Sequence, residues 1–98
     1  MPRIADAERL VIGGVDTHAD RHVAAVVDQV GRVLGTGQFP ATAAGYAAAL
    51  RWMRSHGELV KAGVEGTGSY GAGLAGYLAG EGAGVVEVIR PNRQARRR

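Results

Sequence analysis

The sequence predicts one small α/β domain built on a mixed β-sheet, with its elements in the order β-β-β-α-β-α-β. Three observations support this prediction. Three short β-branched segments occur before residue 40, and the turns between them are too short to hold a helix. Two segments with helical spacing then alternate with two further β-branched segments. The length of 98 residues suffices for a single domain only.

Three strands are expected in the first part of the chain, at residues 10–15, 22–28 and 33–39. The first ends at Asp16, and the third ends before Pro40, which has no N–H to donate to a neighbouring strand. Gly31 lies in the turn between the second and third strands, where a positive φ favours glycine. Short turns join antiparallel neighbours, so these strands are expected to form a meander.

A helix is expected after Thr42, whose hydroxyl can cap the first N–H groups of a helix. Tyr46, Leu50 and Met53 follow at the spacing of one helix face. Gly57 is the expected C-cap, because basic side chains precede it and glycine tolerates the backbone conformation that ends a helix.

The second half of the chain predicts two further strands with a helix between them. Residues 60–64 form the fourth expected strand, which leads into Glu65, and residues 85–89 form the fifth. Apolar side chains at helical spacing mark the helix: Tyr70, Leu74, Tyr77 and Leu78. Glycines dilute this helix at about 0.5–1 kcal/mol each relative to alanine, so it depends on packing. The helix-strand units are expected to return parallel, in a sheet that is incomplete at its C-terminal end.

Composition and charge exclude several classes of protein. The chain has no cysteine, which excludes disulfides and thiolate metal sites. It has no run of about 20 apolar residues and no N-terminal apolar segment of the kind found in secretory signals. We therefore expect no membrane partner and a cytoplasmic location. Residues 1–9 are polar and expected to be disordered, whereas residues 10–89 form the expected domain.

The positive charge of the chain is concentrated in a basic tail at residues 90–98. This tail holds five arginines and no acid, whereas residues 1–89 hold seven basic and nine acidic residues. The arginines are Arg90, Arg93, Arg96, Arg97 and Arg98. Guanidinium groups pair with phosphate oxygens, so the tail favours nucleic-acid binding over a merely solubilising role. A non-catalytic nucleic-acid-binding module is therefore an alternative function.

Two acidic residues follow strands that are expected to lie side by side. Asp16 ends the first strand and Glu65 ends the fourth, and each taken alone is typical of a turn or a helix start. Parallel pairing of these strands places both carboxylates at one edge of the sheet, where open α/β sheets hold their sites. The two charges repel unless a cation lies between them, which predicts Mg²⁺, with Mn²⁺ as a substitute. His18 is a candidate additional ligand.

A competing motif spans residues 66–71, which read G-x-G-x-x-G between an expected strand and an expected helix. Glu87 lies 21 residues after Gly66, near the position of a ribose-binding acid in dinucleotide-binding proteins. Three points count against this alternative. The chain has 16 glycines, Glu65 would repel a pyrophosphate, and three strands precede the motif instead of one.

The sequence resembles the N-terminal part of DEDD-type insertion-sequence transposases, the recombinases that are guided by a bridging RNA. The resemblance covers about residues 10–98 and is strongest in the block Glu65-Gly66-Thr67-Gly68-Ser69-Tyr70. Weaker similarity lies in residues 11–16, in residues 50–53 and in residues 85–88.

This resemblance implies a ribonuclease-H-like, RuvC-like fold in which four acids bind Mg²⁺ and assist DNA strand cleavage and exchange. Asp16 matches the first acid and Glu65 the second. Thr67 and Tyr70 match the block after the second acid and are expected to bind nucleic acid. Implied partners are DNA and a guide-type RNA. The other two acids and a serine nucleophile lie beyond Arg98 in the family, after a helical segment, so this chain is expected to be an inactive N-terminal fragment. An exposed sheet face is expected to favour a homo-oligomer.

Overall fold

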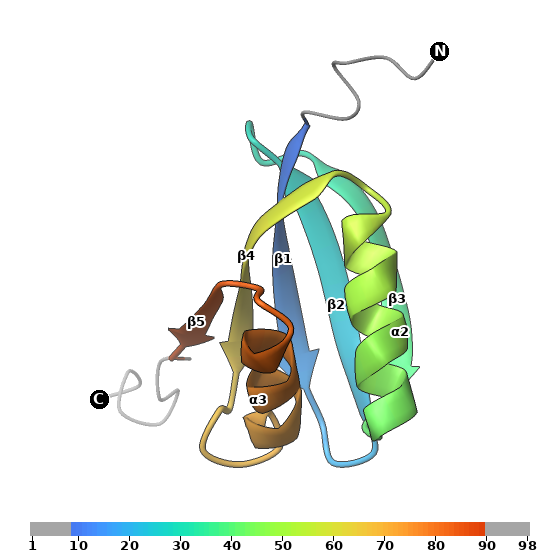
Figure 1. Cartoon of the computed structure of the whole chain (residues 1–98), viewed down its shortest axis with the longest axis vertical. Coiled ribbons are helices and arrows are strands. Elements are labelled where there is room, and N and C mark those ends of the chain that lie inside the picture. The colour runs from blue at the N-terminus through green and yellow to red at the C-terminus, as the bar shows by residue number, and fades with distance from the viewer. Residues whose placement is uncertain (1–8, 90–98) are drawn as a thin grey trace, which may run out of the picture.

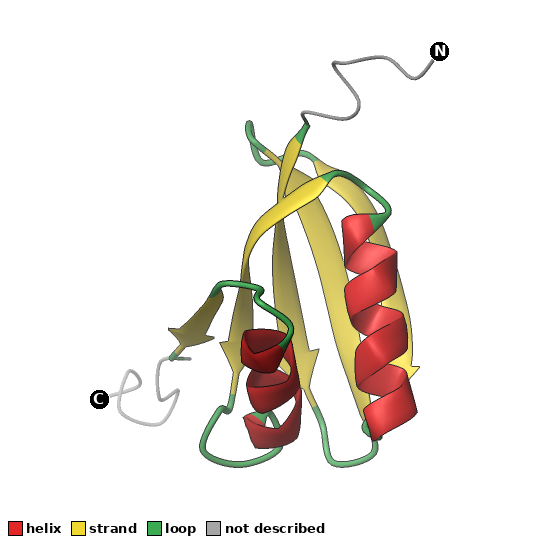
Figure 2. Cartoon of the chain, in the orientation of Figure 1, coloured by secondary structure: helices red, strands yellow, loops and turns green. Residues whose placement is uncertain are grey.

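The computed structural model describes residues 9–89, which form a mixed α/β domain with a five-stranded sheet and two helices (Figures 1 and 2). The elements are β1 (Leu10–Thr17), β2 (Arg21–Asp28), β3 (Val33–Pro40), α2 (Ala43–Arg54), β4 (Glu58–Glu65), α3 (Ala72–Gly80) and β5 (Val85–Val88). The predicted α/β class is thereby confirmed. The expectations for the N-terminal segment and for the arginine tail fall on residues 1–8 and 90–98, outside the described residues.

The sheet has the strand order β3-β2-β1-β4-β5. The pairs β1–β2 and β2–β3 are antiparallel, whereas β1–β4 and β4–β5 are parallel. This arrangement is compatible with a ribonuclease-H-like fold. Because β1 is central and parallel to β4, the carboxyl ends of these two strands meet at one edge of the sheet (Figure 1).

Both described helices lie on the same face of the sheet (Figure 1). Val11, Val15 and Met53 are buried in the core beneath them. Gly13 lies between these two valines, and a Cβ atom there would come within 2.6 Å of the Met53 sulfur. The glycine therefore lets the α2 side chain reach the backbone of β1, which brings the helix close to the central strand.

Helix α2 begins as predicted and ends differently. The Thr42 hydroxyl accepts the Gly45 N–H at 3.1 Å, which confirms the N-cap. The expected C-cap at Gly57 is wrong, because the helix ends at Arg54 and Ser55 is the cap. Gly57 instead has a φ of +153°, and a Cβ there would lie 2.6 Å from the carbonyl oxygen of Arg9. Glycine is needed at this position for close contact between two segments of backbone.

Helix α3 starts later than the periodicity predicted. Leu74 and Leu78 are buried against the sheet, as expected of a core-facing helix side. Tyr70 is not part of the helix, because α3 begins at Ala72 and Tyr70 lies in the preceding turn with 59% of its surface exposed. The Gly71 N–H donates to the Gly66 carbonyl at 2.8 Å, which closes a turn over these residues before the helix can start.

Candidate functional site

The two candidate acids lie side by side at the end of the central strand pair. Val15 pairs in register with Val64, so Asp16 and Glu65 are the next residues of two parallel strands. Adjacent strands lie about 4.8 Å apart, and successive side chains point to opposite faces of a sheet. Since Val15 and Val64 point into the core, both carboxylates belong to the face opposite the helices. The predicted juxtaposition is therefore present in the fold.

Asp16 and Glu65 both line two hollows in the surface. One hollow of about 280 Å³ lies at the end of the sheet, and its lining consists of Asp16, Thr17, His18, Glu65, Gly66, Ser69, Tyr70 and Val88. A second hollow of about 330 Å³ is lined by the same two acids and mainly by small and apolar residues of the central strands. The Asp16 side chain is 45% exposed, so its oxygens are accessible to solvent and to a ligand.

Thr17 holds the two strand ends together. Its hydroxyl donates a hydrogen bond of 2.9 Å to the backbone carbonyl of Glu65, across 48 residues of sequence. This bond fixes the ends of β1 and β4 relative to each other at the point where the carboxylates project. Sequence reasoning missed Thr17, although a hydroxyl directly after a strand-end aspartate was the available signal.

The glycines after Glu65 shape the turn beside the acids. Gly66 has a φ of +65°, and its carbonyl accepts the N–H groups of Ser69 and Gly71 at 2.8 Å each. A Cβ atom on Gly71 would collide with the Glu65 carbonyl oxygen. Contacts within the chain thus account for the first and last glycines of the G-x-G-x-x-G motif. A Cβ atom on Gly68 would meet no other heavy atom within 4 Å, so no contact explains this glycine.

The two histidines near Asp16 have different roles. The His18 Nε2 atom lies 3.5 Å from Asp16 Oδ2, at the site. His22 is buried on the helix side of the sheet, where its ring stacks on Tyr46 with centroids 5.9 Å apart. Its Nδ1 accepts the backbone N–H of His18 at 3.4 Å, and burial lowers the pKa of His22 below its usual value. Its Nε2 atom has no hydrogen-bond partner within the described chain.

The donor set at this edge fits a magnesium ion. Within residues 9–89 there is no group of three or more His, Asp or Glu side chains that could hold a metal. Mg²⁺ commonly takes only one or two carboxylates and keeps several waters, so Asp16 and Glu65 are donors of the type that it binds. Tyr70 also lines the hollow at the end of the sheet, whereas Thr67 lies in the same turn without lining it. The tail arginines lie outside the described residues.

Comparison with known proteins points to one family. The DEDD transposase family of the IS110 type, described as a transposase, matches residues 13–98. No curated protein matches the chain. Among solved structures, the chain is similar to the ethanolamine utilization protein EutJ from Carboxydothermus hydrogenoformans, with 22% identity and a TM-score of 0.47. That match covers 81% of this chain and 36% of the EutJ chain.

No helix within residues 9–89 has the length and hydrophobicity needed to cross a lipid bilayer.

The family match covers nearly the whole sequence, including both candidate acids and the turn after Glu65. The chain therefore belongs to the DEDD transposase family of IS110-type insertion sequences.

Proposed function

We propose that this chain supplies the first two metal-binding acids of a transposase that cuts and rejoins DNA with Mg²⁺. The observation that carries the proposal is the position of Asp16 and Glu65 at the ends of adjacent parallel strands, on one face and lining the same hollows. Carboxylates at the ends of neighbouring strands repel each other, and a divalent cation between them would relieve that repulsion. Family membership supports a role in transposition.

Each residue at the site has a distinct proposed role. A bound Mg²⁺ would supply Lewis-acid activation of a phosphodiester. The Asp16 and Glu65 carboxylates would hold the ion, and the Thr17 hydroxyl would keep the two strand ends at a fixed separation. His18 lies 3.5 Å from Asp16 and would orient that carboxylate through a charge-assisted contact when protonated.

Nucleic acid is the proposed partner of the hollow at the end of the sheet. Tyr70 is exposed beside Glu65 and offers an aromatic face on which a base can stack, and Thr67 lies in the same turn. The arginines of residues 90–98 are proposed to contact phosphates. DNA is the proposed substrate and a guide-type RNA the second proposed nucleic acid.

The chain alone is proposed not to cleave DNA. Two-metal phosphoryl chemistry needs ligands that hold both ions about 3.5–4 Å apart. Within residues 9–89 no group of three or more acidic or histidine side chains could hold a metal, so the two carboxylates would hold at most one ion, and weakly. Further ligands would have to come from another part of the active protein.

Mg²⁺ titration followed by thermal unfolding tests the proposal. A ligand that binds only the folded state raises the melting temperature as its concentration exceeds Kd. We expect Mg²⁺ to stabilise the wild type, and Asp16→Asn or Glu65→Gln to remove most of the effect. Asp20→Asn is the matched control, because Asp20 lies in the neighbouring turn and its side chain is 83% exposed. Equal stabilisation of all four proteins would refute the assigned ligands.

A further inference from the structure

The chain leaves the sheet beside the acid pair. Strand β5 runs parallel to β4, and its last residue, Val88, pairs in register with Glu65 (Figure 1). Val88 also lines both of the hollows that Asp16 and Glu65 line. The first arginine of the basic tail, Arg90, therefore follows a residue in the wall of the candidate metal site by two positions.

Chain connectivity alone limits the distance between Arg90 and the acids. Two residues of extended chain span at most about 7 Å, and adjacent strands lie about 4.8 Å apart. The Cα atom of Arg90 is thus within about 12 Å of the Cα atom of Glu65 for every course that the chain can take. Arg98 comes ten residues after Val88, and the same limit allows it a separation of about 35 Å. The start of the tail is therefore kept near the acids, whereas its end is not.

The hollows at the acid pair contain no permanent positive charge of their own. Within residues 9–89, their lining includes two carboxylates and His18 but no lysine or arginine. Two carboxylates repel a phosphodiester, and a divalent ion bound between them only balances their charge. A further cation would add the attraction that holds the backbone of a nucleic acid at the site.

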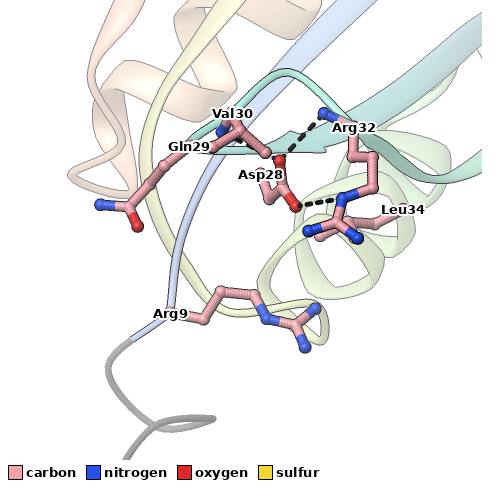
Figure 3. A pocket seen from close by; sticks show the side chains of 6 residues that line it. All are labelled: Arg9, Asp28, Gln29, Val30, Arg32 and Leu34. Carbon is pink, nitrogen blue, oxygen red and sulfur yellow. Dashed lines mark hydrogen bonds and ion pairs between the residues drawn. The ribbon is translucent and has the colours of Figure 1, made fainter.

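The arginines of the described chain lie in other places. Arg9 and Arg32 line a pocket at the β2–β3 turn, at the opposite end of the sheet (Figure 3). Arg51 and Arg54 line the groove between α2 and α3. Arg21 begins β2 at the acid end of the sheet but lines neither hollow. This leaves the basic tail, which follows β5 directly, as the source of permanent positive charge for the site.

We propose that Arg90 binds the same phosphodiester strand as a metal ion held by Asp16 and Glu65. The inference rests on the proposed function of the acid pair, and it adds to that function a residue that binds phosphate. A guanidinium group can pair with two phosphate oxygens at once, which suits it to this role. Two groups that hold one strand strengthen each other's binding, so Mg²⁺ and nucleic acid should bind cooperatively.

Binding of a fluorescent single-stranded oligodeoxynucleotide to the full chain tests this proposal. Its affinity is measured by anisotropy with and without Mg²⁺ at constant ionic strength. Arg90→Gln is the test variant, and Arg90→Lys keeps the charge without the planar pair of donors. Arg98→Gln is the matched control, because it removes the same charge from the far end of the same tail. The Asp16→Asn/Glu65→Gln double variant reports the effect of Mg²⁺ that does not depend on the acid pair.

We expect Mg²⁺ to tighten oligonucleotide binding by the wild type about fivefold or more, relative to its effect on the double variant. This factor should fall to about one in Arg90→Gln, be intermediate in Arg90→Lys and stay unchanged in Arg98→Gln. Both glutamine variants should reduce the slope of log K against log salt by about 1, so the loss of charge itself does not separate them.

Equal Mg²⁺ factors in Arg90→Gln and Arg98→Gln would overturn the proposal, because the tail would then act only as diffuse charge. A wild-type factor no larger than that of the double variant would overturn it as well. Failure of the proposed function has a different signature, since Mg²⁺ would then not raise the melting temperature of the wild type without the oligonucleotide. Stabilisation by Mg²⁺ without cooperativity would contradict the role of Arg90 alone.

Discussion

The two ends of the sheet hold their carboxylates in different ways. At the β2–β3 turn, Asp28 is satisfied by backbone N–H groups two and four residues away and by the side chain of Arg32. At the other end, Asp16 and Glu65 come together only because β1 and β4 pair in parallel, and Thr17 ties them across 48 residues of sequence. An acid with local backbone partners stabilises a turn, whereas acids brought together by long-range pairing form a candidate site.

The largest expected effect comes from crowding the acid pair. Gly71→Ala places a methyl group against the Glu65 carbonyl oxygen, so the strand end must move. We expect a loss of about 3 kcal/mol in the free energy of unfolding, measured with urea, together with weaker Mg²⁺ binding. Gly68→Ala is the control, because its Cβ has open space and should change stability by no more than about 0.5 kcal/mol. Similar losses in both variants would argue against this steric explanation.

A smaller loss is expected at the turn end. Asp28→Ala leaves two backbone N–H groups without their acceptor and removes the ion pair, so the free energy of unfolding should fall, but by less than in Gly71→Ala. Mg²⁺ stabilisation should persist in this variant. Asp28→Asn keeps an oxygen acceptor and should lose less. Loss of the Mg²⁺ effect in Asp28→Ala would show that the two ends are not independent.

Thr17→Val should cost about 1 kcal/mol, because it removes the hydrogen bond to the Glu65 carbonyl and retains the shape of the side chain. Its effect on Mg²⁺ affinity should exceed that of Asp28→Ala, even though its effect on stability is smaller. Thr17→Ser keeps the hydroxyl and should bind Mg²⁺ with the affinity of the wild type. If Thr17→Val binds Mg²⁺ as the wild type does, Thr17 has only a structural role.

The smallest expected effects are on the pH dependence of stability, which should differ between His22, near the acid pair, and Asp28, at the β2–β3 turn. Burial lowers the pKa of His22 in the folded protein. The neutral ring therefore makes its full contribution to the free energy of unfolding above the unfolded pKa of about 6.5, and this contribution is lost as the pH falls below that value. The pKa of Asp28 is lowered too, so its contribution is lost only as the pH falls below about 4. The melting temperature of the wild type should fall between pH 7 and pH 5. This fall should be smaller in His22→Phe and unchanged in the control His56→Gln.

Much of this comparison could be predicted from the sequence, because its signals are local. Thr42 as a helix cap and Gly31 in a turn with positive φ follow from residue chemistry, and both are present. The pairing of Asp16 with Glu65 followed from two strand ends and a parallel connection.

Other features depend on contacts that no local pattern encodes. Gly57 is of the residue type that commonly caps a helix C-terminus, but its backbone conformation is set by close contact with Arg9, 48 positions earlier in the sequence. Tyr70 matches the helical spacing, yet the turn closed by Gly66 and Gly71 excludes it from α3.

Paramagnetic broadening by Mn²⁺ tests the central claim most directly. Mn²⁺ substitutes for Mg²⁺ at oxygen ligands, and it broadens the NMR signals of nearby amides. At low Mn²⁺ the amides of residues 15–18 and 64–67 should disappear first, while those of residues 28–34 stay sharp and the Asp16→Asn/Glu65→Gln double variant shows no broadening. Broadening centred on the β2–β3 turn, or unchanged in the double variant, would contradict the assignment of the acid pair as the metal site.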